Sequence, residues 1–376
     1  MNASPGAPPP PPLTPPVIAP APPPPRRSRG WMIAAIILIG LLAISVLGNF
    51  AFLSRAFSFN NTFPSGGASV AGPRLEEWLL EDHHADNKIA VITVDGIITG
   101  QTLDQAGNSM VDVIRAQLRR ARRDARVKAV VLKVNSPGGE VMASDQIYRA
   151  IKSFQDESHK PVVCSMGSLA ASGGYYISSP CRWIVANDLT ITGSIGVILH
   201  TWNYRGLMDK VGIWPETFKS GKFKDMLSGE RETNQIPPEE YVMVQNLIDQ
   251  TYQKFKDVVQ AGRARAHQLN KSEGRALADD WSQYADGRVL SGTEALKLGF
   301  VDQLGDFQDA VARARELAGI SKANLVEYRE RYDISDFLRL FGQSESAAHT
   351  VKFDLGLDVP KLQPGYLYFL SPTFVN

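Results

Sequence analysis

The sequence predicts an α/β domain with a mostly parallel sheet, and three observations lead to this prediction. Short apolar runs such as 127–134 (VKAVVLKV) are bounded by turn residues, as buried strands are. Amphipathic stretches of helical length, such as 110–124, alternate with these runs. The strand-to-helix connections are short and rich in glycine, which suits right-handed crossovers between parallel strands. A chain of 376 residues with 44% hydrophobic content can bury a sizeable core.

The N-terminal region predicts a membrane anchor. Residues 1–30 form a proline-rich tail that cannot build a core. Arg26, Arg27 and Arg29 close this tail, and residues 31–53 contain no charged residue. Such a stretch spans the ~30 Å hydrocarbon layer of a bilayer. Because the basic residues precede it, we expect a single-pass signal anchor in the inner or plasma membrane, with a cytoplasmic N-terminus and an exported domain. A cleaved signal peptide would have a shorter apolar core.

The remaining elements follow in order. Residues 54–87 are predicted to be a linker, because 60–72 is rich in Asn, Ser, Gly and Pro. The folded domain is expected over 88–320. Its expected strands are 89–94, 127–134, 161–166, 183–186, 190–198, 286–290 and 299–302. Its expected helices are 110–124, 141–154, one starting near 170, 239–266 and 293–298.

A C-terminal extension over 321–376 ends in an apolar, strand-prone run, 364–370 (PGYLYFL). This run could pair with a sheet edge of its own chain or of a neighbouring subunit, or it could be disordered. The sequence leaves these alternatives open, and it also leaves open whether the run docks in a groove.

Charge and cysteine content exclude several classes of function. The net charge of +1 gives no reason to expect a nucleic-acid partner. Cys164 and Cys181 have no partners at metal-ligand spacing. We expect a buried free thiol at Cys164, with a bridge to Cys181 as the alternative in an oxidising compartment. His83 and His84 are interpreted as a surface pair, and no metal or cofactor is predicted.

Ser172 has the sequence context of a nucleophile. It follows a short apolar run and a turn of small residues, directly before Gly173 and a predicted helix. Main-chain N–H groups at a helix start are partly positive, which suits acyl transfer. An ordinary helix-capping serine is the alternative. A second glycine pair, Gly138 and Gly139, follows another strand and could offer N–H groups to an oxyanion.

A serine nucleophile needs a base to accept its proton. None of the six histidines has a suitable context, and His200, just past a predicted strand, lacks an acidic partner. The segment 219–225 (KSGKFKD) offers three lysines instead. A lysine works near neutrality only if its surroundings lower its pKa by ~3 units, roughly 4 kcal/mol. On spacing alone, each of the three is more often a solvated loop residue.

Four motifs together resemble the signal peptide peptidase A family of serine proteases, peptidase family S49, in its short, single-domain form. They are 135–139 (NSPGG), 166–176 (MGSLAASGGYY), 192–197 (TGSIGV) and 220–225 (SGKFKD). The resemblance covers roughly 89–305, and it includes the downstream sequences DGRV and LGFVD. One motif alone would be unspecific, whereas all of them in the family's order are specific.

The resemblance implies a Ser/Lys dyad. Ser172 becomes the nucleophile, Lys224 the general base, and Ser194 the residue that orients the lysine amine. The N–H groups implied for the oxyanion hole are those of Gly139 or its neighbour Gly138, and of Gly173.

The resemblance also implies a core of repeated ββα units, similar to crotonase and Clp protease. It further implies a homo-oligomeric ring on the membrane, with serine and lysine contributed by adjacent subunits. The expected function is a membrane-anchored serine endopeptidase that degrades residual signal peptides and other hydrophobic peptides. A crotonase-like acyl-thioester enzyme and a non-catalytic membrane scaffold are the alternatives.

Overall fold

The structure, a computed structural model, describes residues 38–42, 45, 72–102, 108–331 and 367–370. The chain divides after residue 70 into two compact units. In the first unit, residues 38–42 and 45 are helical, and the rest of the predicted anchor over 31–53 lies outside the described residues, as does the proline-rich tail. Among the residues described, no helix is both long enough and apolar enough to cross a bilayer.

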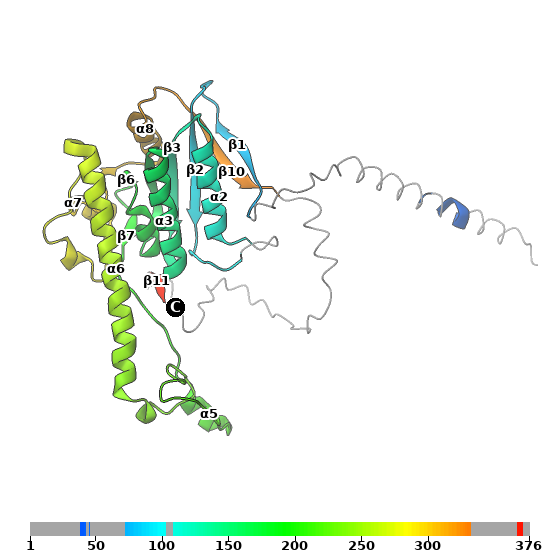
Figure 1. Ribbon diagram of the computed structural model, residues 1–376, viewed down its shortest axis with the longest axis vertical. Coiled ribbons are helices and arrows are strands. Elements are labelled where there is room, and N and C mark those ends of the chain that lie inside the picture. Colours follow the sequence, from blue (N-terminus) through cyan, green and yellow to red (C-terminus); the bar gives the residue numbers. More distant parts are fainter. Residues whose placement is uncertain (1–37, 43–44, 46–71, 103–107, 332–366, 371–376) are drawn as a thin grey trace, which may run out of the picture. The chain divides into compact units, whose positions relative to one another are not determined.

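The second unit is built on a mixed sheet of nine strands in the described chain (Figure 1). Its main path runs through β1 (Leu75–Glu81), β10 (Asn324–Glu330), β2 (Lys88–Asp95), β3 (Val127–Ser136), β5 (Val162–Ala171), β6 (Trp183–Ala186) and β9 (Gln303–Leu304). A side branch runs from β5 through β7 (Ile191–Gly193) to β8 (Val289–Ser291). Only the β1–β10 and β7–β8 pairs of this sheet are antiparallel.

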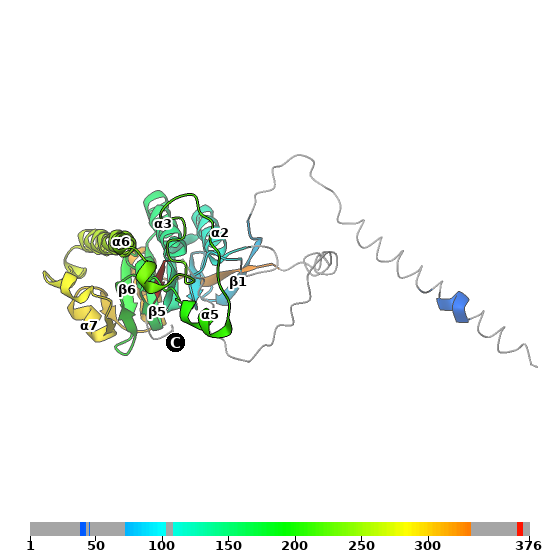
Figure 2. The same cartoon turned by 90° about the horizontal axis from the view of Figure 1, so that it is seen from below.

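Helices cover both faces of the sheet. Helices α2 (Met110–Arg123) and α3 (Val141–Ser158) lie on one face, and α8 (Phe307–Leu317) lies on the other (Figures 1 and 2). Along β2, Ala90 and Ile92 belong to the core under α2 and α3, whereas Ile89 and Val91 pack in the core with α8. Successive strand residues point to opposite faces. A strand covered on both faces is apolar throughout, which is why these strands were recognisable as continuous apolar runs.

The remaining elements complete the domain. They are β4 (Gly138–Glu140), α4 (Gly173–Ser178), α5 (Arg205–Val211), α6 (Pro238–Asn270), α7 (Gly292–Lys297) and β11 (Tyr368–Leu370), with single-turn helices at 233–235, 271–273 and 281–284. The first part of α6 projects beyond the sheet, and α5 lies at its far end (Figure 1). We call residues 202–243, which include α5, the arm.

The folded chain begins earlier and ends later than predicted. Strand β1 lies inside the predicted linker over 54–87, and β10 lies beyond the predicted boundary at residue 320. These two strands pair with each other, and β10 also pairs in parallel with β2. Strand β1 is a largely exposed edge strand rich in glutamate, so it lacks the apolar pattern of a buried strand.

Other boundaries also differ from the prediction, among them those of the strands expected over 190–198 and 286–290, which form as β7 and β8. Strand β5 continues to Ala171, so the helix expected near residue 170 begins at Gly173. The strand expected over 299–302 forms later, as β9. The extra length of β5 has a structural reason, because its second half pairs with β7 after its first half has paired with β6.

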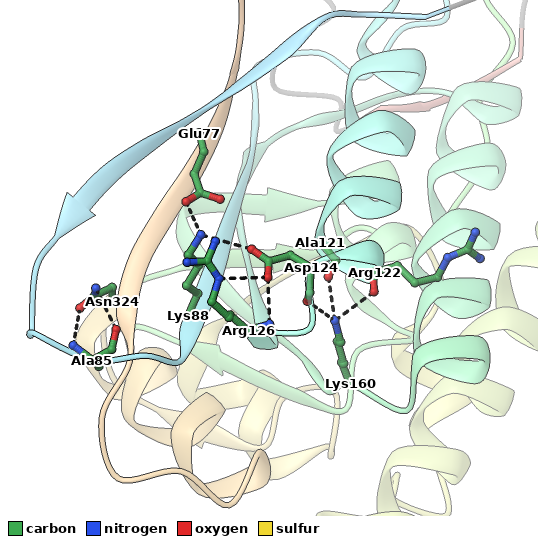
Figure 3. Close-up of polar contacts among 9 residues, drawn as sticks. All are labelled: Glu77, Ala85, Lys88, Ala121, Arg122, Asp124, Arg126, Lys160 and Asn324. Atoms are coloured by element: carbon green, nitrogen blue, oxygen red, sulfur yellow. Dashed lines mark hydrogen bonds and ion pairs between the residues drawn. The ribbon is translucent and has the colours of Figure 1, made fainter. Parts of the chain in front are cut away.

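A polar cluster holds the opposite end of the sheet (Figure 3). Lys88 forms ion pairs with Glu77 of β1 and, at 3.2 Å, with Asp124 after α2. Lys160 Nζ donates to three main-chain carbonyls at the end of α2, at 2.8 to 3.1 Å. Burial raises the pKa of Asp124, but hydrogen bonds from the Arg126 N–H and Lys88 outweigh it and leave that pKa below its ordinary value.

Candidate active site

Ser172 lies in a sharp turn between β5 and α4. Its backbone angles are φ 53° and ψ −114°, which non-glycine residues rarely adopt. Such a conformation costs of order 1–3 kcal/mol and persists only where the surroundings hold it. Here its N–H donates to Gly193 O at 2.8 Å, and its carbonyl accepts from Tyr176 N at 2.8 Å. A strained strand–turn–helix of this kind is how many hydrolases present a nucleophile.

The Ser172 hydroxyl is buried and makes no hydrogen bond within the described chain. The residue is 1% exposed, and its Oγ has no hydrogen-bond partner within the part of the chain that the structure describes. An unsatisfied buried polar group costs about 1–3 kcal/mol. A buried group of this kind needs a specific explanation, and a reactive role is one.

Glycines allow two backbone segments to meet beside Ser172. A Cβ on Gly173 would lie 3.1 Å from both Gly138 Cα and Gly139 N. A Cβ on Gly174 would lie 2.8 Å from Ser136 O, which is closer than real Cβ atoms approach. The absence of side chains therefore brings the start of α4 against β4. The three glycines predicted for the oxyanion hole lie together as a result.

The N–H groups of Gly138 and Gly139 point in different directions. Gly138 N donates to Ser136 Oγ at 3.1 Å. Glu140 N donates to Ile98 O at 2.8 Å, and Ile98 N donates to Gly138 O at 2.8 Å. Since adjacent strand residues bond to opposite sides, the Gly139 N–H faces the other edge of β4, where Gly139 pairs with residue 369 of β11.

Ser194 lies next to Ser172, just past the end of the neighbouring strand. Ala171 of β5 pairs with Gly193 of β7, so the two serines follow paired residues. Ser194 is buried and also has a positive φ, of 51°. Its N–H donates to Arg288 O at 2.7 Å, which ties this turn to the residues before β8. Two buried serines with positive φ angles thus follow the ends of adjacent strands.

Lys224 lies elsewhere, on the arm. It is exposed and belongs to a turn in which its own N–H donates to Gly221 O at 3.3 Å. Its neighbour Asp225 forms ion pairs with Lys219 at 2.7 Å and with Arg231 at 3.3 Å. The hydrogen bond from Lys219 is the main reason that the pKa of Asp225 lies below its ordinary value. Within the described chain, no hydrogen bond joins Lys224 to Ser172.

The cysteines and the histidine pair take no part in this site. Cys164 and Cys181 are buried and unbridged, and Cys164 Sγ donates to Ser178 Oγ at 3.2 Å. Burial raises the pKa of the Cys181 thiol. His83 and His84 are exposed, as predicted. Over the described ranges, no three His, Cys, Asp or Glu side chains gather in a way that could hold a metal ion.

The sequence did not identify the contacts of β11 beside the site. Phe369 of β11 packs against Tyr176 of α4 and Phe255 of α6. The apolar character of 364–370 was the available signal. It could not name a partner, because β4 and β11 are more than two hundred residues apart.

Comparisons with known proteins identify the family. The model of peptidase family S49 matches residues 154–321, and that of Clp protease matches residues 83–181. The chain is 37% identical to a putative protease of Synechocystis sp., over 72% of this chain and 88% of that protein. It is 33% identical to a putative signal peptide peptidase SppA of Enterococcus faecium, over 68% of this chain and 71% of that protein.

A longer relative matches as well. Protease 4 of Salmonella typhi is 38% identical over 66% of this chain, which spans only 38% of that protein. The range matched by the S49 family includes Ser172, Ser194 and Lys224, and the range matched by Clp protease includes both glycines of β4. The mixed α/β sheet, the buried serine at its strand ends and these matches lead to one conclusion: the chain belongs to peptidase family S49 and is a serine protease.

Proposed function

We propose that this protease is a membrane-anchored endopeptidase with a Ser172/Lys224 dyad, and that it degrades residual signal peptides and other hydrophobic peptides at the membrane. The observation that supports it most is the strained, buried Ser172, whose hydroxyl has no partner in the described chain and lies beside the glycines of β4. The Enterococcus relative is named a putative signal peptide peptidase, which supports the substrate class.

The proposed chemistry is acyl transfer. The uncharged Lys224 amine, oriented by Ser194, takes the proton of Ser172 Oγ, which bonds to the carbonyl carbon of a peptide. The N–H groups of Gly139 and Gly173 hold the negative oxygen that forms. The Lys224 ammonium returns the proton to the leaving nitrogen as the C–N bond breaks. Water, deprotonated by the same amine, then hydrolyses the ester and releases the serine.

We propose that the lysine reaches the serine of a neighbouring subunit in a homo-oligomeric ring. A lysine base has to be covered to work near neutrality, and Lys224 is exposed in one chain. The arm also exposes large apolar side chains, including Trp214 and Phe218. Exposed apolar patches mark interaction sites, and we propose that these side chains of the arm form one. A ring would cover it and bury Lys224 in the same step.

The proposed organisation follows the chain. Residues 1–30 form a cytoplasmic tail, residues 31–53 anchor the protein in the inner or plasma membrane, and the protease domain lies on the far side of that membrane. The uncharged stretch with arginines before it supports this orientation. The domain runs from β1 to β10, and the match to Clp protease supports a core of repeated ββα units like that of crotonase and Clp protease.

The test uses the full-length chain in detergent micelles and a quenched fluorescent peptide of apolar and small residues. We expect Ser172→Ala and Lys224→Ala to abolish cleavage, and a serine-directed covalent probe to label the parent at Ser172. Lys222→Ala is the matched control, because this exposed lysine of the same turn bonds Glu239 at 3.2 Å. Parental rates in Ser172→Ala or Lys224→Ala would refute the dyad. An unlabelled Ser172 would favour the acyl-thioester enzyme or the scaffold.

A further inference from the structure

Helix α2 carries more positive charge than the fold neutralises. Residues 110–126 contain six arginines and two aspartates. Asp112 is held in the capping box at the start of the helix, and Asp124 forms an ion pair with Lys88 at 3.2 Å. Three of the arginines form no ion pair within the part of the chain that the structure describes, and they are Arg115, Arg119 and Arg123. We call these three the basic face of α2.

The neighbouring helix α3 shows the opposite arrangement. Arg149 pairs with Asp145 at 2.6 Å, and Lys152 pairs with Asp156 at 2.7 Å. Each pair spans four residues, a spacing at which opposite charges stabilise a helix. The cations of α3 are therefore neutralised within the helix itself, whereas those of the basic face of α2 are not.

The spacing of the basic face works against the helix. Arg115, Arg119 and Arg123 are four residues apart, so all three lie on one side of α2. Like charges at this spacing destabilise a helix. An arginine in the last turn complements the helix dipole, which accounts for Arg123 but not for the other two. This unfavourable charge density is offset when an anion from outside the chain lies on the face.

A small hollow of about 130 Å³ lies beside this face, between α2 and α3. Its lining combines guanidinium groups with apolar side chains, namely Arg115, Arg119, Arg122, Leu118, Ala150 and Phe154. Arg122 is paired with the exposed Glu157, so the charge left for a guest is that of Arg115 and Arg119. Guanidinium groups match the oxygen atoms of phosphate with paired N–H donors. Apolar side chains beside them suit the headgroup region of a lipid better than a free ion.

The chain enters the domain beside the same face. A Cβ on Gly72 would lie 3.5 Å from the Arg119 guanidinium, and Arg120 donates to Leu75 O at the start of β1. Residues 54–71 separate Gly72 from the proposed anchor. Because a chain spans at most about 3.6 Å per residue, this linker holds Gly72 within roughly 65 Å of the bilayer. Such a tether raises the effective concentration of the basic face at the lipid headgroups.

We propose that the basic face of α2 docks the protease domain on anionic phospholipids of the membrane that holds the anchor, and that the hollow takes a headgroup phosphate. This inference rests on the proposed function, because it uses the anchor over 31–53. The attraction between basic side chains and an anionic lipid surface falls off within a Debye length, ~8 Å at physiological salt. Docking therefore requires direct contact with the headgroups, and high salt releases it. The docked domain stays close to the hydrophobic peptides in the bilayer.

Arginine footprinting of the full-length Ser172→Ala chain tests the docking without any cleavage. The chain is placed in lipid nanodiscs of phosphatidylcholine, with or without phosphatidylglycerol, and phenylglyoxal then modifies the accessible guanidinium groups. We expect phosphatidylglycerol to lower the labelling of Arg119 and Arg123 about fivefold, and high salt to restore it. Arg275 is the internal control, because it is exposed and forms no ion pair within the described ranges. Its labelling should not change.

Three outcomes would overturn the docking. Labelling that is equal in both lipids would show that the face stays in water. Protection already present in phosphatidylcholine alone would show that a neighbouring subunit covers the face. Protection by inorganic phosphate in phosphatidylcholine discs, as strong as that by phosphatidylglycerol, would show a site for a free anion.

A charge-removing variant makes the test specific to α2. In Arg115→Gln/Arg119→Gln, the protection of Arg123 by phosphatidylglycerol should fall to about twofold or less, since glutamine keeps the helix but removes the charge. The matched control is Lys254→Gln/Lys322→Gln, which removes two exposed cations outside α2. This control should keep the full protection. An equal loss in both variants would show attraction by net charge alone and would overturn the docking face.

Two further measurements separate the docking from the proposed function. Flotation with pure phosphatidylcholine vesicles reports on the anchor, because this lipid carries no net charge for the arginines to bind. A chain that floats only with phosphatidylglycerol has the basic face but not the anchor. Ser172-dependent cleavage by the parent, without a lipid-dependent footprint, would leave the protease standing and refute the docking. A footprint without any cleavage by the parent would refute the proposed chemistry and leave the docking standing.

Discussion

The sheet end around Ser172 and the arm differ in how completely a single chain builds them. Around Ser172, paired strands, close glycine contacts and a packed core hold each main-chain segment. On the arm, Trp202, Trp214 and Phe218 are 77%, 71% and 93% exposed. One chain therefore packs the region of the candidate nucleophile completely, whereas it leaves the region of the candidate base exposed to a partner.

The difference suggests how activity would be controlled. A strained serine beside fixed N–H groups is preorganised and needs no further change. Lys224 is exposed in one chain, and a lysine can serve as a base near neutrality only where another surface covers it. On this view assembly completes the site.

The largest expected effect comes from removing either residue of the proposed dyad. Ser172→Ala and Lys224→Ala should each lower kcat about 10⁴-fold or more. If the residues act across subunits, co-assembly of the two inactive chains should restore about a quarter of the parental rate, as random head-to-tail pairing allows. The measurement is peptide cleavage after the two chains are dissociated, mixed and reassembled.

The control for that experiment combines Ser172→Ala with the double variant Ser172→Ala/Lys224→Ala, a mixture that holds no intact serine. It should stay inactive. Inactive mixtures of the two single variants, with normal assembly, would place the dyad within one chain or assign the base to another residue.

A buried ion pair tests the stability of the packed part of the domain, in contrast to the exposed arm. Arg263 of α6 is fully buried, pairs with Asp302, and donates to Gly299 O at 3.3 Å, while Asp302 accepts from Ile184 N at 2.8 Å. Asp302→Ala leaves the arginine uncompensated and should lower the free energy of unfolding by about 3–5 kcal/mol. Urea denaturation followed by tryptophan fluorescence measures this. In the control, Arg288→Ala removes an exposed ion pair and should lower the free energy of unfolding by less than about 1 kcal/mol.

On the arm, a substitution should affect activity and assembly more than the stability of the fold. Phe218→Ser removes the most exposed large apolar side chain of the arm, so it should change the free energy of unfolding by less than about 0.5 kcal/mol. If the arm is an assembly surface, the same change should lower cleavage at least about tenfold and shift the particle mass in light scattering. Normal mass and activity would show that this part of the arm faces solvent in the working protein.

Much of the core was predictable, because its strands are buried on both faces. Strands β2, β3 and β6 lie where continuous apolar runs placed them. Strands β1 and β10 were missed, because each is defined by pairing with a strand far away in the sequence rather than by its own pattern. Local patterns identify segments that bury themselves and overlook segments that form only against a distant partner.

The same distinction applies to the site. The turn at Ser172 was predictable from its small residues and the apolar run before it. Which glycine N–H is directed at β11 depends on the hydrogen bonds of Ile98 and Ser136, and a sequence motif does not specify these bonds. The contact between Phe369 and Tyr176 likewise depends on tertiary packing. Sequence therefore predicts where the nucleophile stands better than it predicts what contacts it.

The smallest expected effect concerns the loop that supports Ser194. The main-chain carbonyl of Arg288 accepts a hydrogen bond from Ser194 N. The side chain of Arg288 bonds Asp286 and holds the pKa of that carboxyl at about 2, below its ordinary 3.8. Because the pKa is lower in the folded state, ionised Asp286 stabilises the protein above pH 3.8, and this contribution disappears as the pH falls toward 2. Asp286→Asn should lower the Tm by about 1–2 °C at pH 6, with the gap closing between pH 3.8 and 2, since both side chains are half exposed. Asp249→Asn, an exposed carboxylate of α6 bonded to Gln245, is the control in calorimetry, and a gap that stays constant down to pH 2 would contradict the ion pair.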